Sequence, residues 1–115
     1  MGDRARSRSA AENILTAQSG LQAMFGSSEA ASIGILQAVE SRGLAGKVKV
    51  VTFDNSDVHR AALNAGALDV MLVQDPDRIG YEAVRSLALK LRGETPARRL
   101  DLPVRRITRE NAGTL

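Results

Sequence analysis

The sequence contains no cysteine and no tryptophan, and it has one histidine, two phenylalanines and one tyrosine among its 115 residues. Without cysteine, the chain has neither a disulfide framework nor thiolate ligands for a metal ion. No apolar run approaches the roughly 18 residues that a membrane-spanning helix needs, so no span is predicted. Nucleic-acid binders usually combine a basic face with aromatic stacking or a groove-reading helix, and the shortage of aromatic residues disfavours that class.

The formal net charge of +3 is unevenly distributed along the chain. Residues 1–10 carry a charge of +2 and residues 92–115 carry +3, whereas residues 11–91 carry −2. The basic excess therefore lies at the two ends and does not mark a nucleic-acid-binding face. The first arginines are not followed by the apolar region of a secretory signal, so we expect no export address in this sequence.

Hydrophobic periodicity predicts helices and strands in alternation. Helices are expected over residues 9–18, 29–42, 57–65 and 77–92, and strands over 21–25, 48–53, 69–73 and 103–108. Such alternation is typical of an α/β fold with a parallel sheet and right-handed crossovers. Because so few strands make a thin sheet with an open edge that needs a cover, the chain has the character of part of a larger domain.

Residues suited to helix ends fall where the periodicity predicts those ends. Ser28, Ser56 and Asp75 precede helices and can accept a hydrogen bond from the first turn, and Pro76 suits the first helical position. Gly43 and Gly66 follow helices, where a left-handed conformation commonly closes the last turn.

The segment from Val48 to Phe53 is the most apolar strand, and it ends at Asp54. Its unbroken apolar run predicts a strand buried on both faces, as in a sheet with helices on either side. Ligands of such sheets bind at the carboxyl ends of the strands, so Asp54 is a candidate binding residue.

The short helix over residues 57–65 carries the sole histidine. Its buried face is expected to consist of Val58, Ala61, Ala62 and Ala65, which leaves His59 as a solvated surface residue. With no second histidine and no cysteine nearby, a metal site or a nucleophilic triad has almost no support. No glycine loop that cradles phosphate opens a helix, and no cofactor is expected.

The first three predicted strands are each followed by polar residues. These are Ser27, Ser28 and Glu29 after the first strand, then Asp54, Asn55 and Ser56, then Gln74 and Asp75. On parallel strands these groups would meet at one edge of the sheet, where they could bind a ligand rich in hydroxyl groups. The alternative is helix capping, which suits Ser28, Ser56 and Asp75, is an even choice for Asp54, and explains Gln74 poorly.

The strongest amphipathic pattern lies in the last predicted helix. Its apolar positions fall at helical spacing and form one stripe: Gly80, Ala83, Val84, Leu87, Ala88 and Leu91. Such a stripe requires a surface to pack against.

Three segments together resemble the C-terminal part of type I periplasmic sugar-binding proteins, the solute receptors of ABC transporters for ribose-like and galactose-like sugars. The segments are Phe25 to Gly34, Val50 to Ser56 and Val73 to Tyr81, in the same order and spacing as in the family. The resemblance covers nearly all of this chain, which corresponds to about the last third of a family member. It implies a three-layer, flavodoxin-like half of the receptor fold, with residues 1–115 forming an incomplete C-terminal lobe.

The resemblance also implies a sugar-binding role for three residues. The family's aspartate after the central strand falls on Asp54, and its glutamine before proline and glycine falls on Gln74. The third polar position, an asparagine in the family, falls on Ser28, and Glu29 replaces the following aspartate. This departure shortens the reach toward one sugar hydroxyl.

Further expectations concern partners and location. The resemblance implies non-enzymatic binding of a monosaccharide-like ligand, a permease partner and a periplasmic location for the parent protein. In the family, the chain returns to the other lobe after the glutamine, so helix 77–92 and the tail are expected to dock on another lobe or chain. We therefore predict either self-association through the open strand edge and the apolar stripe, or a loosely folded chain.

Alternative functions remain at this stage. The effector-binding core of a lactose-repressor-type regulator shares the fold, but the segment from Asn64 to Val70 looks more like the receptors, and no helix-turn-helix is present. A receiver-like phosphoacceptor at Asp54 would need a neighbouring acidic pair and a later lysine, and neither is found. A structural fragment without a ligand is the last alternative.

Overall fold

The computed structural model describes residues 3–115, which form two compact units. Unit 1 contains the described residues up to Val73 together with Arg105–Leu115, and unit 2 contains Gln74–Val104. Each unit is described below by itself.

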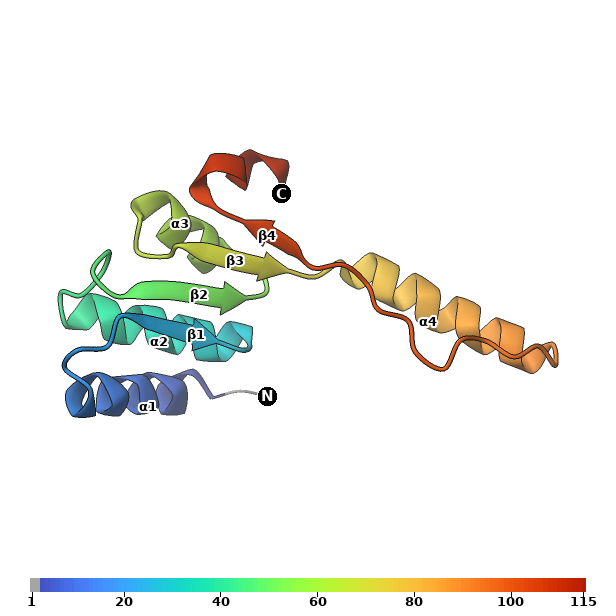
Figure 1. Ribbon diagram of the computed structural model, residues 1–115, viewed down its shortest axis with the longest axis horizontal. Helices are drawn as coiled ribbons and strands as arrows, with labels where there is room; N and C mark the ends of the chain where they lie inside the picture. Colours follow the sequence, from blue (N-terminus) through green and yellow to red (C-terminus); the bar gives the residue numbers. More distant parts are fainter. Residues whose placement is uncertain (1–2) are drawn as a thin grey trace. The chain divides into compact units, whose positions relative to one another are not determined.

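Unit 1 is a four-stranded sheet with helices (Figure 1). The strands are β1 (Ala23–Gly26), β2 (Lys49–Phe53), β3 (Val70–Val73) and β4 (Arg105–Ile107), in the order β1-β2-β3-β4. The first three are parallel neighbours, with Gly26 opposite Thr52 and Thr52 opposite Met71. The α/β class and the mostly parallel sheet are therefore confirmed. The short strand β4 is antiparallel to β3, a direction that its sequence did not indicate.

The helices of unit 1 are α1 (Arg4–Ala17), α2 (Glu29–Ser41) and α3 (Asp57–Ala65), and a 3₁₀ helix, η1 (Arg109–Thr114), follows β4. Helix α1 packs closely on α2, because Gly34 has no side chain: a Cβ built there would lie 2.6 Å from the backbone nitrogen of Arg8. The predicted caps are confirmed at Ser28 and Ser56, and Gly66 closes α3 in the left-handed conformation, with φ of 78°.

The core of unit 1 lies between the helices and one face of the sheet. Side chains along β2 and β3 alternate in burial, so Val50 and Met71 are fully buried whereas their neighbours Val51 and Leu72 remain half-buried outside the core cluster. The central strand was expected to be buried on both faces, but only one of its faces belongs to the core of unit 1. Phe25 of β1, which pairs with Val51 in register, is 56 % exposed.

The buried face of α3 differs from the prediction. His59 and Leu63 are its buried residues, and both are at most 1 % exposed. The predicted face of Val58, Ala61, Ala62 and Ala65 instead lines a groove of about 370 Å³ beside residues of α2. The prediction that His59 is solvated was therefore wrong: His59 and Leu63, one helical turn apart, are the buried residues of α3, and of the predicted alanines only Ala62 packs partly against the core.

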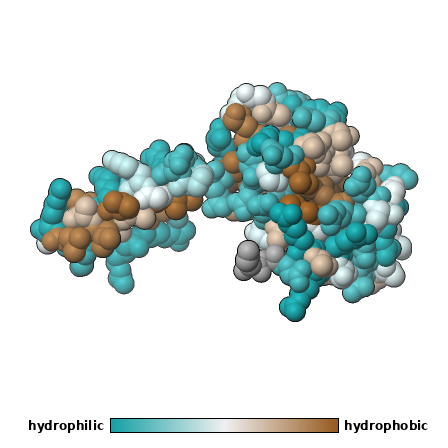
Figure 2. Space-filling view, turned by 180° about the vertical axis from the view of Figure 1, so that it is seen from behind, coloured by the Kyte–Doolittle hydropathy of each residue, from teal (hydrophilic) through white to brown (hydrophobic). Residues whose placement is uncertain are grey.

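Unit 2 consists of α4 (Pro76–Leu91) and the segment that follows it. The helix is well specified locally: Asp75 caps it, Pro76 opens it, and Lys90 lies in its last turn. Nevertheless, none of the 16 residues of α4, all described, is buried. The six apolar residues predicted to form one stripe, Gly80, Ala83, Val84, Leu87, Ala88 and Leu91, lie on this helix. Apolar side chains are visible on the surface of this unit in Figure 2.

Candidate functional site

Two predicted binding residues meet at the carboxyl edge of the sheet in unit 1. Ser28 lies in the loop after β1, and Asp54 directly follows β2. Because β1 and β2 are parallel neighbours, both loops are at the same edge of the sheet. The topology therefore brings Ser28 and Asp54 to one end of the fold, as a binding site at strand ends requires.

Ser28 has a structural role in this loop. Its Oγ accepts a hydrogen bond from the backbone N–H of Ala31 at 3.3 Å, so it caps α2. The hydroxyl proton is not used by that bond, and Ser28 can still donate to a ligand. The neighbouring Glu29 carboxylate pairs with the guanidinium of Arg4 at 3.2 Å, with both side chains largely in solvent.

Asp54 has an unusual backbone. Its φ is 73°, and in the described part of the chain it is the one non-glycine residue with positive φ. The left-handed region is uncommon for residues with a side chain, although aspartate and asparagine tolerate it better than most. The backbone N–H of Asp54 donates to the carbonyl of Leu72 at 2.9 Å, which ties the end of β2 to β3.

Capping of α3 does not explain Asp54. The cap is Ser56, whose Oγ accepts from the backbone N–H of His59 at 3.4 Å. The intervening Asn55 is also occupied, because its side-chain oxygen accepts from Arg60 at 2.9 Å. From the sequence, helix capping and ligand binding were equally plausible roles for Asp54. Because Ser56 is the cap of α3, Asp54 is not.

His59 is an ionisable group whose burial was not predicted from the sequence. Its imidazole is 0 % exposed, and neither ring nitrogen has a hydrogen-bond partner among the described residues. Burial lowers the pKa of His59 below its usual 6.5, while the nearby carboxylates of Glu29 and Asp54 act in the opposite direction. The lowered pKa disfavours the charged imidazolium at this position, close to the loops that carry Ser28 and Asp54. The signal that could have revealed it is its i, i+4 spacing to Leu63.

The third predicted binding residue, Gln74, belongs to unit 2. It is half-buried and precedes Asp75, whose carboxylate accepts from the backbone N–H of Arg78 at 2.9 Å. Asp75 is therefore the cap of α4, as predicted, and Gln74 is not. Its ligand role stays a prediction.

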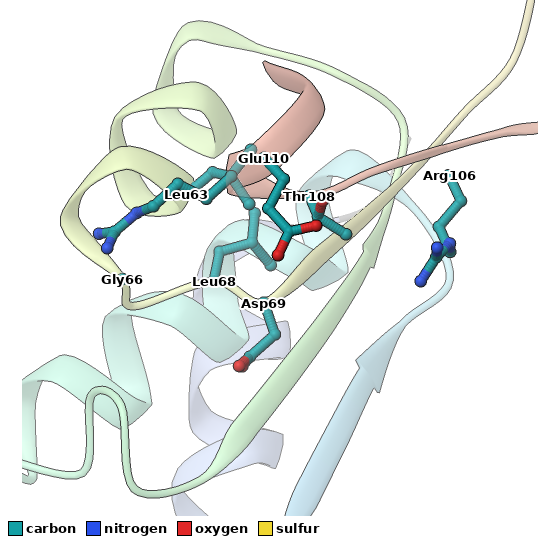
Figure 3. Close-up of a pocket in the computed structure, with 8 residues that line it drawn as sticks. Leu63, Gly66, Leu68, Asp69, Arg106, Thr108 and Glu110 are labelled. Carbon is teal, nitrogen blue, oxygen red and sulfur yellow. The ribbon is translucent and has the colours of Figure 1, made fainter.

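A cavity of about 380 Å³ lies at the opposite, amino-terminal edge of the sheet (Figure 3). Its polar side chains are largely engaged within the fold. Asp69 accepts from Lys49 Nζ and from the Val50 N–H, both at 2.9 Å, and Arg109 donates to the carbonyl of Asn64. Arg106 lies apart from Thr108 and Glu110 in Figure 3. None of Ser28, Asp54 and Gln74 lines this cavity.

Two other kinds of site were sought in residues 3–115. No group of three or more histidine, aspartate or glutamate side chains is placed to hold a metal ion in this range. Among the same residues, no helix has both the length and the apolar character to cross a bilayer.

Comparison with known proteins identifies the family. Residues 1–95 match the model of the periplasmic binding protein domain. The ribose import binding protein of Escherichia coli (strain K12) is 34% identical over 92 residues, which are 80% of this chain and 31% of that protein. The D-allose-binding periplasmic protein of the same organism is 31% identical over 83 residues, or 72% of this chain and 27% of that protein.

A solved structure shows the same relation. An ABC transporter solute-binding protein from Agrobacterium vitis with bound D-fucose has a TM-score of 0.86 and 27% identity, and the match covers 95% of this chain and 38% of that one. This chain thus spans about a third of the length of the relatives it matches. Together, the matched residues 1–95 and the strand order show that the chain belongs to the periplasmic binding protein family.

Proposed function

We propose that this chain is part of a sugar receptor of an ABC transporter and that it binds a monosaccharide-like ligand without chemical conversion. The observation that carries the proposal is the placement of Asp54, at positive φ directly after β2, on the same sheet edge as Ser28. The relatives named for ribose, allose and D-fucose binding support a sugar as the ligand class.

Hydrogen bonding explains how these residues would hold a sugar. A carboxylate accepts from two hydroxyl groups, and charge-assisted hydrogen bonds of this kind are the stronger ones. The Ser28 hydroxyl can donate to a third sugar oxygen while its own oxygen caps α2. Gln74 offers both a donor and an acceptor, and its part in binding rests on the family resemblance.

The remaining partners follow from the same proposal. A permease of an ABC transporter would receive the sugar. The parent protein would act in the periplasm, as the name of the D-allose-binding periplasmic protein suggests. We further propose that the chain has a macromolecular partner, either a second copy or another lobe, since sugar burial between two surfaces supplies much of a receptor's affinity.

A titration tests the sugar-binding proposal. Thermal unfolding of the chain is followed with D-ribose, D-allose, D-fucose and, as a control polyol, glycerol. We expect one sugar to raise the midpoint temperature of unfolding. Asp54→Asn should weaken the affinity for that sugar by about 10-fold or more, because a hydrogen bond to a charged group is worth about 1.5–3 kcal/mol.

Asp57→Asn is the matched control, since the Asp57 side chain is 93 % exposed in the first turn of α3. It should leave the sugar response unchanged. Equal effects of Asp54→Asn and Asp57→Asn, or the same response to glycerol as to every sugar, would contradict the proposed site.

A further inference from the structure

The buried polar side chains of unit 1 gather beneath the loops that carry Ser28 and Asp54. Within residues 3–115, three polar side chains are fully buried, and these are Ser32, Thr52 and His59. Ser32 lies in the first turn of α2, Thr52 near the end of β2, and His59 in the first turn of α3. The core cluster itself is apolar. The polar part of the interior therefore lies at the carboxyl edge of the sheet, next to the proposed sugar site.

Ser32 shows how a buried polar residue can hold a binding loop. Its Oγ donates to the carbonyl of Gly26 at 3.2 Å, and its backbone N–H donates to the carbonyl of Ser28 at 2.9 Å. A Cβ built on Gly26 would lie 2.5 Å from Ser32 Oγ, so the glycine makes room for this hydroxyl. One buried residue thus fastens both ends of the loop that leads to Ser28.

His59 occupies the corresponding position beneath the second loop. Its backbone N–H donates to Ser56 Oγ at 3.4 Å, and the next residue, Arg60, donates to the side-chain oxygen of Asn55 at 2.9 Å. These two bonds tie the loop after Asp54 to the first turn of α3. His59 is the buried side chain of that turn, so its imidazole sets where the turn and the loop lie on the core. The burial is complete within unit 1 and requires no surface outside the described residues.

Packing alone does not call for a histidine at this position. Neither ring nitrogen has a hydrogen-bond partner among the described residues. A buried polar group in that state destabilises a fold, whereas an apolar side chain of similar size does not. Residues that break a rule of core packing without a compensating contact commonly serve a functional site. His59 therefore points to a role in the adjacent site and not in stability.

Two carboxylates act on the imidazole from neighbouring elements. They are Glu29, at the start of α2, and Asp54, after β2, and both favour the protonated ring, whereas burial opposes it. Glu29 is already paired with Arg4. Asp54 is therefore the carboxylate that links the imidazole to the proposed sugar site.

Other charged groups on α3 or packed against it have partners of their own. Asp57 and Arg60 form an ion pair on the helix itself. Arg109 of η1, an element that contacts α3, donates to the carbonyl of Asn64 near the other end of the helix. These groups leave Asp54 as the main route by which a charge on the ring acts on the site.

We propose that His59 is a positioning residue of the sugar site, which in its neutral form holds the Asp54 loop ready for the sugar and which weakens sugar binding when it takes up a proton. Proton and sugar compete for one carboxylate. An imidazolium attracts the Asp54 carboxylate, whereas sugar hydroxyls that donate to Asp54 reduce the negative charge that favours an imidazolium. Each ligand therefore lowers the affinity for the other by the same factor. This inference rests on the proposed sugar binding.

The first test follows the proton directly by NMR. His59 is the sole histidine, so its ring gives a single titration curve in the full chain. The pKa of His59 should fall in Asp54→Asn, which removes a carboxylate that favours the charged ring. It should change far less in Asp57→Asn, because that side chain is exposed and its charge is screened by solvent.

The same titration is repeated on the wild type saturated with whichever of D-ribose, D-allose and D-fucose raises the midpoint temperature of unfolding. Bound sugar should lower the pKa of His59, because it covers the site and engages Asp54. An unchanged pKa in the sugar complex, or in Asp54→Asn, would overturn the inference.

The second test measures affinity for that sugar by titration calorimetry, from pH 7 to well below the midpoint of the His59 titration. The wild-type affinity should fall by about 5-fold or more, the usual size of such a coupling. His59→Gln should bind at pH 7 but lose most of this fall, and the part that remains belongs to the carboxylates. Leu63→Met, at the other buried position of α3, should keep the wild-type profile, because it adds and removes no titrating group.

The outcomes separate the two proposals. The same pH profile in the wild type and in His59→Gln would overturn the inference and leave sugar binding intact. No response to any of the three sugars at neutral pH, in a chain that unfolds cooperatively, would contradict sugar binding and the inference with it. If far-UV circular dichroism shows that His59→Gln does not fold, His59→Leu replaces it, since a leucine in the core also takes up no proton.

Discussion

Unit 1 and unit 2 use the same apolar residue types but place them differently. In unit 1, Leu63, Met71 and Ile107 are at most 1 % exposed and belong to one core cluster. In unit 2, the helix α4 has a cap, a proline at its start and the most regular stripe in the chain, yet none of its described residues is buried. The comparison shows that local signals specify a helix, whereas the packing of side chains from distant segments makes a cooperative unit.

The largest expected difference between the units concerns leucine truncation. Leu63→Ala should lower the free energy of unfolding of unit 1 by about 2–5 kcal/mol, because it leaves a cavity in the core. Leu100→Ala in unit 2, where the side chain is 52 % exposed, should change it by less than about 0.5 kcal/mol. Urea denaturation measures both. Equal losses would mean that the two units unfold as one.

The next comparison uses one substitution at two helical glycines. Gly34→Ala should destabilise unit 1 by about 1–3 kcal/mol, because the new Cβ would lie 2.7 Å from Cβ of Ser7 and force α1 away from α2. Gly80→Ala meets no such contact among the described residues and should stabilise α4 by up to about 1 kcal/mol. Amide hydrogen exchange measures the stability of each helix separately. A change of stability with the same sign in both variants would contradict the comparison.

The buried imidazole predicts a pH dependence confined to unit 1. Because folding lowers the pKa of His59, the unfolded chain binds a proton there more readily than the folded one. The titration of His59 therefore leaves the free energy of unfolding at its full value above about pH 6.5 and reduces it as the pH falls through the lowered folded pKa.

His59→Leu tests this dependence, since His59 is the sole histidine of the chain. The variant should flatten the loss of unfolding free energy between about pH 7 and 5, and should be as stable as the wild type or about 1 kcal/mol more stable at neutral pH, because unsatisfied ring nitrogens leave the core. An unchanged slope would exclude His59 as the titrating group.

The smallest expected difference concerns helix caps. Ser56→Ala and Asp75→Ala should each cost about 1 kcal/mol of local helix stability. For Ser56 this loss should appear in the unfolding of unit 1 as a whole, because α3 carries core residues. For Asp75 it should appear only as faster amide exchange in the first turn of α4. If Asp75→Ala lowered the free energy of unfolding of unit 1 as well, the two units would unfold as one.

The accuracy of the sequence analysis follows the range of the interactions. The bounds of α3 and the caps Ser28, Ser56 and Asp75 were predicted correctly, because they depend on hydrogen bonds within a few residues. The buried face of α3 was not, because histidine was treated as polar although Leu63 one turn later shares its side of the helix. The direction of β4 depends on its partner strand and could not be read from three residues.

The candidate site was predicted in part. The alternation of strands and helices implied that Ser28 and Asp54 share an edge, and the sheet confirms it. The positive φ of Asp54, and the hydrogen bond from its N–H to the carbonyl of Leu72 on the next strand, are not encoded in the local pattern. The burial of the His59 imidazole near these loops likewise depends on tertiary packing.

The antiparallel pairing of β3 with β4 has a consequence for the evolution and engineering of this chain. Val73, the last residue of β3, pairs directly with Arg105, the first residue of β4. In topological terms, residues 74–104 are therefore the loop of a β-hairpin, with its two attachment points already side by side. Because the two attachment points already lie side by side, a change in the length of this segment beyond Gln74 adds little entropic cost to the sheet. The pairing of Val73 with Arg105 thus fixes both ends of residues 74–104 on the sheet that carries Asp54, and Gln74 is the first residue of that segment.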